Sequence, residues 1–241
     1  MERIIVENVS KKFKIGFKKN QSALARFVSL FSGIEPKRII WALKEVSFSV
    51  SSEKIVGIVG KNGSGKSTLL RIIAGIYDVD NGKVSTNGKI VSLISLSMGL
   101  KEKLMMEDNI YICCSLLGLS IKEIKKRFNS IVEFSELGNF IDTKIYQFSE
   151  GMKQRLAFSI AIHCYPDILL LDEVFEVGDK EFKVKSTKKI KEFTKNGTTV
   201  LLVSHGLDIV ERYCDRVIWL DEGRIVRIGD TKEVLNEYQR Y

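Results

Sequence analysis

The segment Gly60–Ser67 constrains the fold more than any other part of the chain. It reads Gly-Lys-Asn-Gly-Ser-Gly-Lys-Ser, follows the apolar run Ile55–Val59 and precedes a segment with helical patterning. The spacing G-x-x-x-x-G-K-[ST] between a strand and a helix is typical of a phosphate-binding loop. Its glycines let backbone N–H groups turn inward around a phosphate, and the following helix points its positive end at the same anion. A glycine-rich turn with a chance lysine explains this context less well.

Each position of this loop has an expected role in binding ATP and Mg²⁺. We expect Lys66 to neutralise β- and γ-phosphate oxygens, and Ser67 to ligate Mg²⁺. The residues predicted to contact ATP are contiguous: Gly60, Lys61, Asn62, Gly63, Ser64, Gly65, Lys66, Ser67 and Thr68.

A second candidate feature is the apolar run Ile168–Leu171, which ends in the carboxylates Asp172 and Glu173. In α/β sheets, ligands bind at the carboxyl ends of the strands, where the phosphate loop also lies. We therefore expect Asp172 to hold Mg²⁺ directly or through water, and Glu173 to orient or deprotonate an attacking water. Taken alone, the pair would be better interpreted as two acids that cap a strand.

The rest of the chain predicts a parallel α/β core interrupted by helices. Short aliphatic runs such as Val200–Val203 favour buried strands, whereas residues from about 108 to 163 have helical patterning. Further strands are predicted at Ile4–Val9 and Glu45–Val50. A hairpin-like stretch is predicted at Gly82–Leu96, because Asn-Gly pairs punctuate it.

Composition excludes some classes of protein and leaves others open. No run approaches the roughly 20 apolar residues of a membrane-spanning helix, and no leader for secretion is expected. The four cysteines show neither metal-ligand spacing nor a disulfide framework. The net charge of +8 suits nucleic acid, an anionic membrane face or phosphate ligands, and does not choose among them.

The stretch Phe148–Arg155 reads Phe-Ser-Glu-Gly-Met-Lys-Gln-Arg and resembles the signature motif of ABC transporter ATP-binding subunits, usually written L-S-G-G-Q. It lies upstream of the acidic strand, as that family requires. Downstream, Val203–His205 looks like the strand that carries the family's switch histidine. A plain P-loop kinase is disfavoured, because most P-loop families lack the signature segment.

The resemblance covers nearly the whole chain and implies one nucleotide-binding domain, 1–241. The implied fold is α/β, with a P-loop (RecA-like) parallel-sheet core, an N-terminal antiparallel β subdomain and an inserted α-helical subdomain. The expected boundaries are 1–94 and 165–241 for the core with its β subdomain, 95–164 for the helical subdomain and 14–40 for an insertion.

The resemblance also implies roles for single residues. Glu173 and His205 would act in hydrolysis, and Asp179 falls at the family's D-loop aspartate. An aromatic residue stacks on adenine in the family, which places Phe13 there with Trp41 as the alternative; Phe13 as a core residue is about as plausible. The signature residues that would close the ATP site of a second copy are Ser149, Glu150, Gly151 and Met152.

Three positions depart from the family's pattern. Glu150 replaces the first glycine of the signature motif and Met152 replaces its glutamine. An acid in the first turn of a helix is favoured by the helix dipole, so Glu150 can face solvent. Ser95 stands at the Q-loop position in place of a Gln or Glu, which weakens the expectation that this loop contacts Mg²⁺ or water directly.

A closer likeness is to the subfamily that exports bacterial surface polysaccharides. It implies a homodimer that hydrolyses ATP as a peripheral protein at the cytoplasmic face of the bacterial inner or plasma membrane and powers a separate permease. The cargo would be lipid-linked O-antigen, capsule or teichoic acid, and no nucleic-acid partner is expected. The alternative is a non-transport ABC ATPase that acts on nucleic acid or ribosomes. The segments that carry the likeness are Trp41–Phe48, Glu107–Tyr111, Ile131–Leu137 and Asp172–Asp179.

The insertion before Trp41 is typical of the same subfamily. Its apolar residues Leu24, Phe27, Val28 and Phe31 recur at helical spacing between basic flanks, which predicts one short amphipathic helix. Such a helix suits a membrane face or the entrance of the permease. Simple coverage of the sheet explains the apolar stripe equally well.

Overall fold

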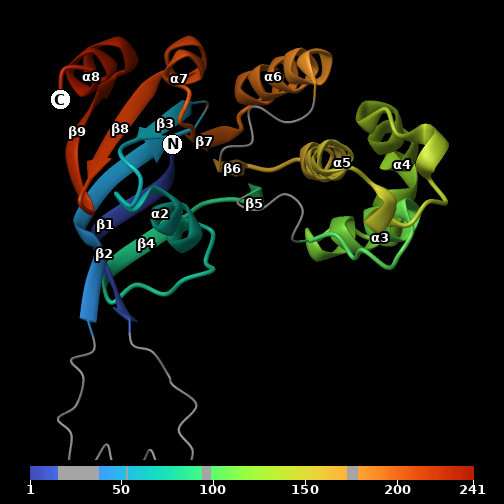
Figure 1. The fold of residues 1–241 in the computed structure, drawn as a ribbon, viewed down its shortest axis with the longest axis horizontal. Helices are drawn as coiled ribbons and strands as arrows, with labels where there is room; N and C mark the ends of the chain where they lie inside the picture. Colours follow the sequence, from blue (N-terminus) through green and yellow to red (C-terminus); the bar gives the residue numbers. More distant parts are fainter. Residues whose placement is uncertain (16–37, 53, 94–98, 173–178) are drawn as a thin grey trace, which may run out of the picture.

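A six-stranded sheet forms the core of the computed structural model, which describes residues 1–15, 38–52, 54–93, 99–172 and 179–241 (Figure 1). The strand order is β5–β6–β7–β3–β8–β9; neighbours are parallel except for the antiparallel pair β8 and β9. The bounds are β3 (Ile55–Val59), β5 (Ile90–Leu93), β6 (Ile168–Asp172), β7 (Thr199–Val203), β8 (Arg216–Asp221) and β9 (Arg224–Asp230).

Both faces of this sheet are buried, which explains its aliphatic strands. In β7, Val200 and Leu202 pack in one hydrophobic cluster, whereas Leu201 and Val203 pack in another on the opposite face. The second cluster contains helix α2 (Lys66–Ile73). The first contains residues of α6 (Lys180–Lys195), α7 (Leu207–Tyr213) and α8 (Thr231–Tyr238).

The predicted N-terminal β subdomain is a three-stranded antiparallel sheet of order β2–β1–β4. Its bounds are β1 (Glu2–Ile15), β2 (Arg38–Ser51) and β4 (Asn81–Thr86). The first two strands are longer than the predicted Ile4–Val9 and Glu45–Val50. Register shifts in their pairing disturb the alternation on which the sequence pattern relies. Residues 14–15 and 38–40 therefore belong to the sheet, and the predicted helix with Phe27 and Phe31 lies outside the described residues.

The predicted hairpin at Gly82–Leu96 is wrong. β4 pairs with β1 in the antiparallel sheet, whereas β5 pairs with β6 in the parallel one. Between them Gly88 adopts a φ of 116°, and the amide of Lys89 donates to the Asp167 carboxylate at 2.8 Å. The Asn-Gly signal marked a real turn, but the chain leaves it toward a different sheet.

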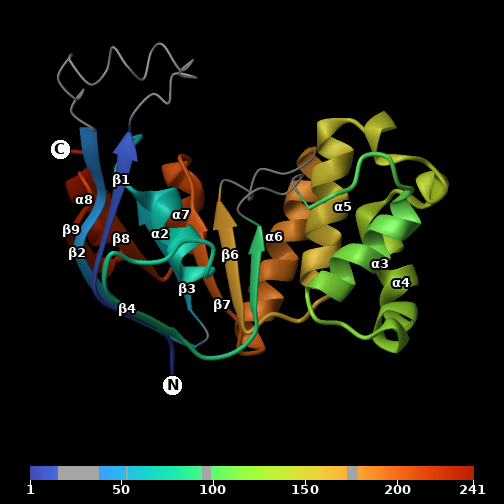
Figure 2. The same ribbon diagram turned by 90° about the horizontal axis from the view of Figure 1, so that it is seen from below.

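Three helices lie beside the sheet, between β5 and β6 in the chain: α3 (Met106–Leu116), α4 (Ile121–Ser135) and α5 (Glu150–Ile162) (Figure 2). Short 3₁₀ turns at Gly138–Phe140 and Ile145–Gln147 connect α4 to α5. A capping box between Ser120 and Glu123 explains where α4 begins. The predicted α/β fold with inserted helices is thus confirmed. No helix within the described ranges is long and apolar enough to cross a membrane.

Candidate active site

The phosphate loop joins β3 to α2 in a conformation that needs glycine. Gly60, Gly63 and Gly65 have φ values of 152°, 82° and 106°. A Cβ on Gly60 would lie 2.0 Å from the Leu220 carbonyl oxygen, and one on Gly65 would lie 2.3 Å from that of Ala42. Both positions therefore exclude a side chain by contact as well as by backbone angle.

Lys66, at the end of this loop, hydrogen-bonds to the two residues at its start. Its ammonium Nζ donates to the carbonyl oxygens of Gly60 at 2.6 Å and Lys61 at 3.0 Å. The residue is only 6% exposed. A cation held this far from water is stabilised by nearby negative charge, so the environment favours an anionic ligand at the loop.

The residues present fit a phosphate group. Among the described residues, nothing hydrogen-bonds the buried hydroxyl of Ser64, and a Cβ on Gly63 would meet no described atom within 4 Å. Helix α2, described in full, has no side-chain cap and no acid in its first turn, where Ser67 and Thr68 are half-buried. The loop therefore offers a hydroxyl, backbone N–H groups and a helix N-terminus to an anion.

The register of the sheet brings Asp172 and His205 to the edge that carries the loop. Asp172 lies opposite Val203 of β7, which in turn lies opposite Ile58 of β3. Strands are about 4.8 Å apart, so Asp172 and Ile58 are roughly 10 Å apart across the sheet. Gly60 lies two residues after Ile58, and His205 lies two residues after Val203 and is exposed. The structure thus gathers three of the predicted features at one edge.

The predicted signature residues lie at the start of α5. Ser149 is the N-cap, and its hydroxyl accepts a hydrogen bond from the Met152 amide at 3.2 Å. Glu150 is exposed in the first turn, in agreement with a solvent-facing acid. Both views place α5 beyond β6 and β5 as seen from α2, so within one chain these residues lie apart from the phosphate loop (Figures 1 and 2).

The two candidate adenine-stacking residues lie on opposite faces of the β1–β2 ribbon. Phe13 is opposite Ile40 and Trp41 is opposite Lys12, and adjacent rungs of a ladder point to opposite faces. The Phe13 ring packs edge-on against the ring of Tyr77, just beyond α2, with 5.6 Å between the two ring centres. This contact places Phe13 on the side of α2 and favours it over Trp41.

Asp179 caps helix α6, and its carboxylate accepts a hydrogen bond from the Phe182 amide at 2.9 Å. This hydrogen bond has the larger effect and the positive charge of Arg155 a smaller one; both lower the pKa of Asp179 below its usual value. The ion pair between Arg155 and Asp179 was missed from the sequence. The motif Phe148–Arg155 was recognised, but no sequence signal pairs its last residue with the D-loop.

Two further predicted site residues, Glu173 and Ser95, lie outside the described residues.

Residues 43–176 match the protein family described as ABC transporter. The chain belongs to the ABC transporter family. The recognition made from Phe148–Arg155 and the phosphate loop is therefore confirmed.

Relatives of this ABC protein include ATP-binding proteins of teichoic acid and O-antigen export. It is 41% identical to the teichoic acids export ATP-binding protein TagH of Lactococcus lactis over 99% of this chain and 51% of the relative. It is 43% identical to the O-antigen export system ATP-binding protein RfbB of Klebsiella pneumoniae over 83% of this chain and 81% of the relative. The chain spans about half the length of the TagH proteins of L. lactis and Enterococcus faecalis.

Solved structures of the family share the fold. The ATP-binding cassette MJ0796, solved as a dimer in a post-hydrolysis state with ADP and Pi, is 25% identical and has a TM-score of 0.77. That match covers 95% of this chain and 98% of MJ0796. An ATP-binding subunit of an ABC transporter matches with a TM-score of 0.78 at 24% identity, which supports the fold alone.

Proposed function

We propose that this chain binds and hydrolyses ATP to power export of a surface polysaccharide through a separate permease. The observation that carries the proposal is the phosphate loop, in which the buried Lys66 hydrogen-bonds to the backbone of Gly60 and Lys61. The loop lies at the same edge of the sheet as Asp172. The proposed cargo is a lipid-linked O-antigen, capsule or teichoic acid, and the similarity to TagH and RfbB supports O-antigen or teichoic acid among these.

The chain's own residues divide the work of hydrolysis. Gly60–Thr68 bind the phosphates through backbone N–H groups, and Lys66 neutralises their charge. Ser67 and Asp172 would hold Mg²⁺, which neutralises charge that develops during phosphoryl transfer. Glu173 takes a proton from the attacking water, and His205 contacts the γ-phosphate.

Two copies complete each site. Ser149 and Gly151 of one copy close over ATP on the phosphate loop of the other, because one chain holds these elements apart. Glu150 points to solvent in the same turn and Met152 follows it. ATP binding therefore joins the copies and hydrolysis releases them. The dimeric structure of the MJ0796 cassette supports the pairing of two copies.

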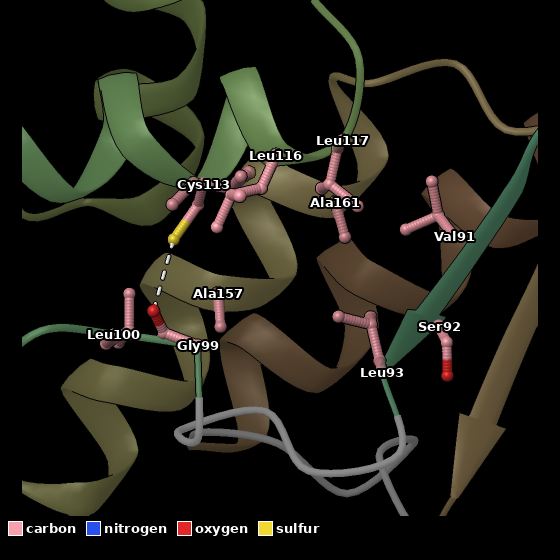
Figure 3. Close-up of a pocket in the computed structure, with 11 residues that line it drawn as sticks. Val91, Ser92, Leu93, Gly99, Leu100, Cys113, Leu116, Leu117, Ala157 and Ala161 are labelled. Carbon is pink, nitrogen blue, oxygen red and sulfur yellow. Dashed lines mark hydrogen bonds between the residues drawn. The ribbon is translucent and has the colours of Figure 1, made fainter. Parts of the chain in front are cut away.

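An apolar recess is the proposed contact with the permease, at the cytoplasmic face of the membrane. Side chains from β5, α3 and α5 surround about 160 Å³, among them Leu93, Cys113 and Ala157 (Figure 3). Leu116 at its rim is 75% exposed. An apolar side chain from a helix at the cytosolic end of a permease suits this recess by size and polarity.

Deletion and complementation test the function. Loss of the chain should abolish surface polysaccharide, and the wild-type chain should restore it together with ATP hydrolysis that copurifies with a polytopic membrane protein. RNA or ribosomes retained through high salt, with normal surface polysaccharide in the deletion, would favour the alternative non-transport ATPase.

The adenine contact predicts a difference between two aromatic residues. Phe13→Ala should weaken ATP binding about 10-fold, because stacking on a base contributes about 1–3 kcal/mol. Trp41→Ala should change it little, because Trp41 lies on the opposite face, 45% exposed, beneath the Lys12 ammonium. Titration with a fluorescent ATP analogue measures both. The reverse order would assign the adenine to Trp41.

A further inference from the structure

Four charged side chains from three helices form a continuous chain of alternating sign, which we call the Arg155 clamp. Lys185 of α6 lies 2.8 Å from Glu136, the C-cap residue of α4. Glu136 also lies 3.2 Å from Nη1 of Arg155 on α5. The other terminal nitrogen of Arg155 pairs with Asp179, the N-cap residue of α6.

Arg155 is the centre of the clamp and is suited to that place by its shape. Its side chain is 17% exposed, and its guanidinium lies 5.3 Å from the centre of the Phe182 ring. A planar guanidinium can serve two carboxylates with two different nitrogens in a fixed geometry, whereas an ammonium acts as a point charge. The aromatic rings of Phe134, Phe158 and Phe182 pack together beneath it.

The clamp joins the two segments that a second copy would meet. Arg155 lies on the helix whose first turn carries Ser149 and Gly151, and Asp179 is the D-loop residue at the start of α6. Lys185 strengthens the same junction from α6, because its Nζ also donates to the Phe134 carbonyl oxygen at 3.0 Å near the end of α4.

We propose that Arg155 is a positioning residue, which holds Asp179 in register with the signature residues Ser149 and Gly151. Both segments then reach the nucleotide of the second copy together. This inference rests on the proposed ATP-driven dimer. Arg155 itself touches no nucleotide; it acts through Asp179 and through the orientation of α5.

The energetics favour a role in alignment over a role in folding. The side chains of Glu136 and Asp179 are 44% and 56% exposed, so solvent screens their ion pairs with Arg155, and such pairs contribute little to stability. The catalytic rate, in contrast, depends steeply on position, because a misplacement of about 1 Å can cost about 100-fold.

Steady-state ATP hydrolysis and dimer formation test the clamp. Arg155→Gln should lower kcat about 10- to 100-fold, while ATP affinity of the isolated single chain and its thermal midpoint stay near wild type. In a Glu173→Gln background, Arg155→Gln should also reduce the fraction of ATP-bound dimer on a sizing column. Arg155→Lys should restore only part of the rate, because an ammonium cannot offer two nitrogens in a fixed geometry to two carboxylates.

Asp179→Asn provides a second route to the same conclusion. Asparagine caps helices as well as aspartate does, so α6 keeps its N-cap while the charge partner of Arg155 is lost. The variant should reproduce the loss of kcat, and combining it with Arg155→Gln should add little further loss, as expected for residues that act through one contact.

A matched pair of glutamates supplies the control. Glu136→Gln breaks an ion pair to Arg155, whereas Glu102→Gln breaks the 2.8 Å pair to Lys153 on the same helix. Only Glu136→Gln should lower kcat. Wild-type kcat in Arg155→Gln, or additive losses in the double variant, would overturn the inference. Absence of ATP hydrolysis in the wild-type chain with its permease would instead overturn the proposed function.

Discussion

Glu173→Gln is expected to bind ATP normally and to hydrolyse it about 100- to 10,000-fold more slowly than the wild-type chain. Glutamine keeps the shape of glutamate and still hydrogen-bonds water, but it accepts no proton and bears no charge. Binding should survive because the phosphates are held by the loop backbone and Lys66, and Mg²⁺ by Ser67 and Asp172. With turnover stopped, the ATP-bound dimer should accumulate.

Sizing columns run with and without MgATP measure this accumulation, and phosphate release measures the rate. Near wild-type turnover would show that Glu173 is not the general base. An ATP-bound variant that stays monomeric, even with the permease present, would contradict the site shared between two copies.

Lys66→Ala is expected to weaken ATP binding on the order of 100-fold, since each hydrogen bond to a charged group contributes about 1.5–3 kcal/mol. The substitution also removes the bonds from Nζ to the carbonyl oxygens of Gly60 and Lys61, which tie the two ends of the loop together. No shift from monomer to dimer should follow addition of MgATP, in contrast to Glu173→Gln.

Titration of the purified chain with a fluorescent ATP analogue measures the affinity, and Lys54→Ala serves as the control. Lys54 also carries a positive charge but lies just before Ile55, at the end of β3 opposite the loop. An unchanged affinity in Lys66→Ala, with a folded protein by circular dichroism, would show that the phosphates bind elsewhere.

The elements predicted correctly from sequence are those whose signal is local. Gly60, Gly63 and Gly65 are favoured by their own positive φ angles, so the motif alone predicts the turn. The runs Ile168–Leu171 and Val200–Val203 are aliphatic throughout because both faces of the sheet are covered. Glu150 was likewise expected in the first turn of a helix, and the N-cap bond of Ser149 that begins this helix joins residues within one turn.

The predictions that failed or stayed open concern pairing between distant segments. Gly82–Leu96 contains a turn and two strands, but their partners β1 and β6 lie far away in the chain, so its sequence cannot show that they enter different sheets. The choice between Phe13 and Trp41 depends on the register of the β1–β2 ribbon, which shifts at several points. A shift of one residue turns each side chain to the other face.

By itself, then, the sequence determined the phosphate loop, the carboxylate-ended strand and the signature helix, because hydrogen bonds and backbone angles within a few residues specify them. The shared edge of Asp172 and the loop was expected from the general rule for α/β sheets, but tertiary structure alone decided that β4 and β5 enter different sheets and that Arg155 meets Asp179. Those relations depend on strand order and helix packing, which join residues many positions apart. No short pattern encodes such long-range contacts, since their stability comes from burial of the whole core.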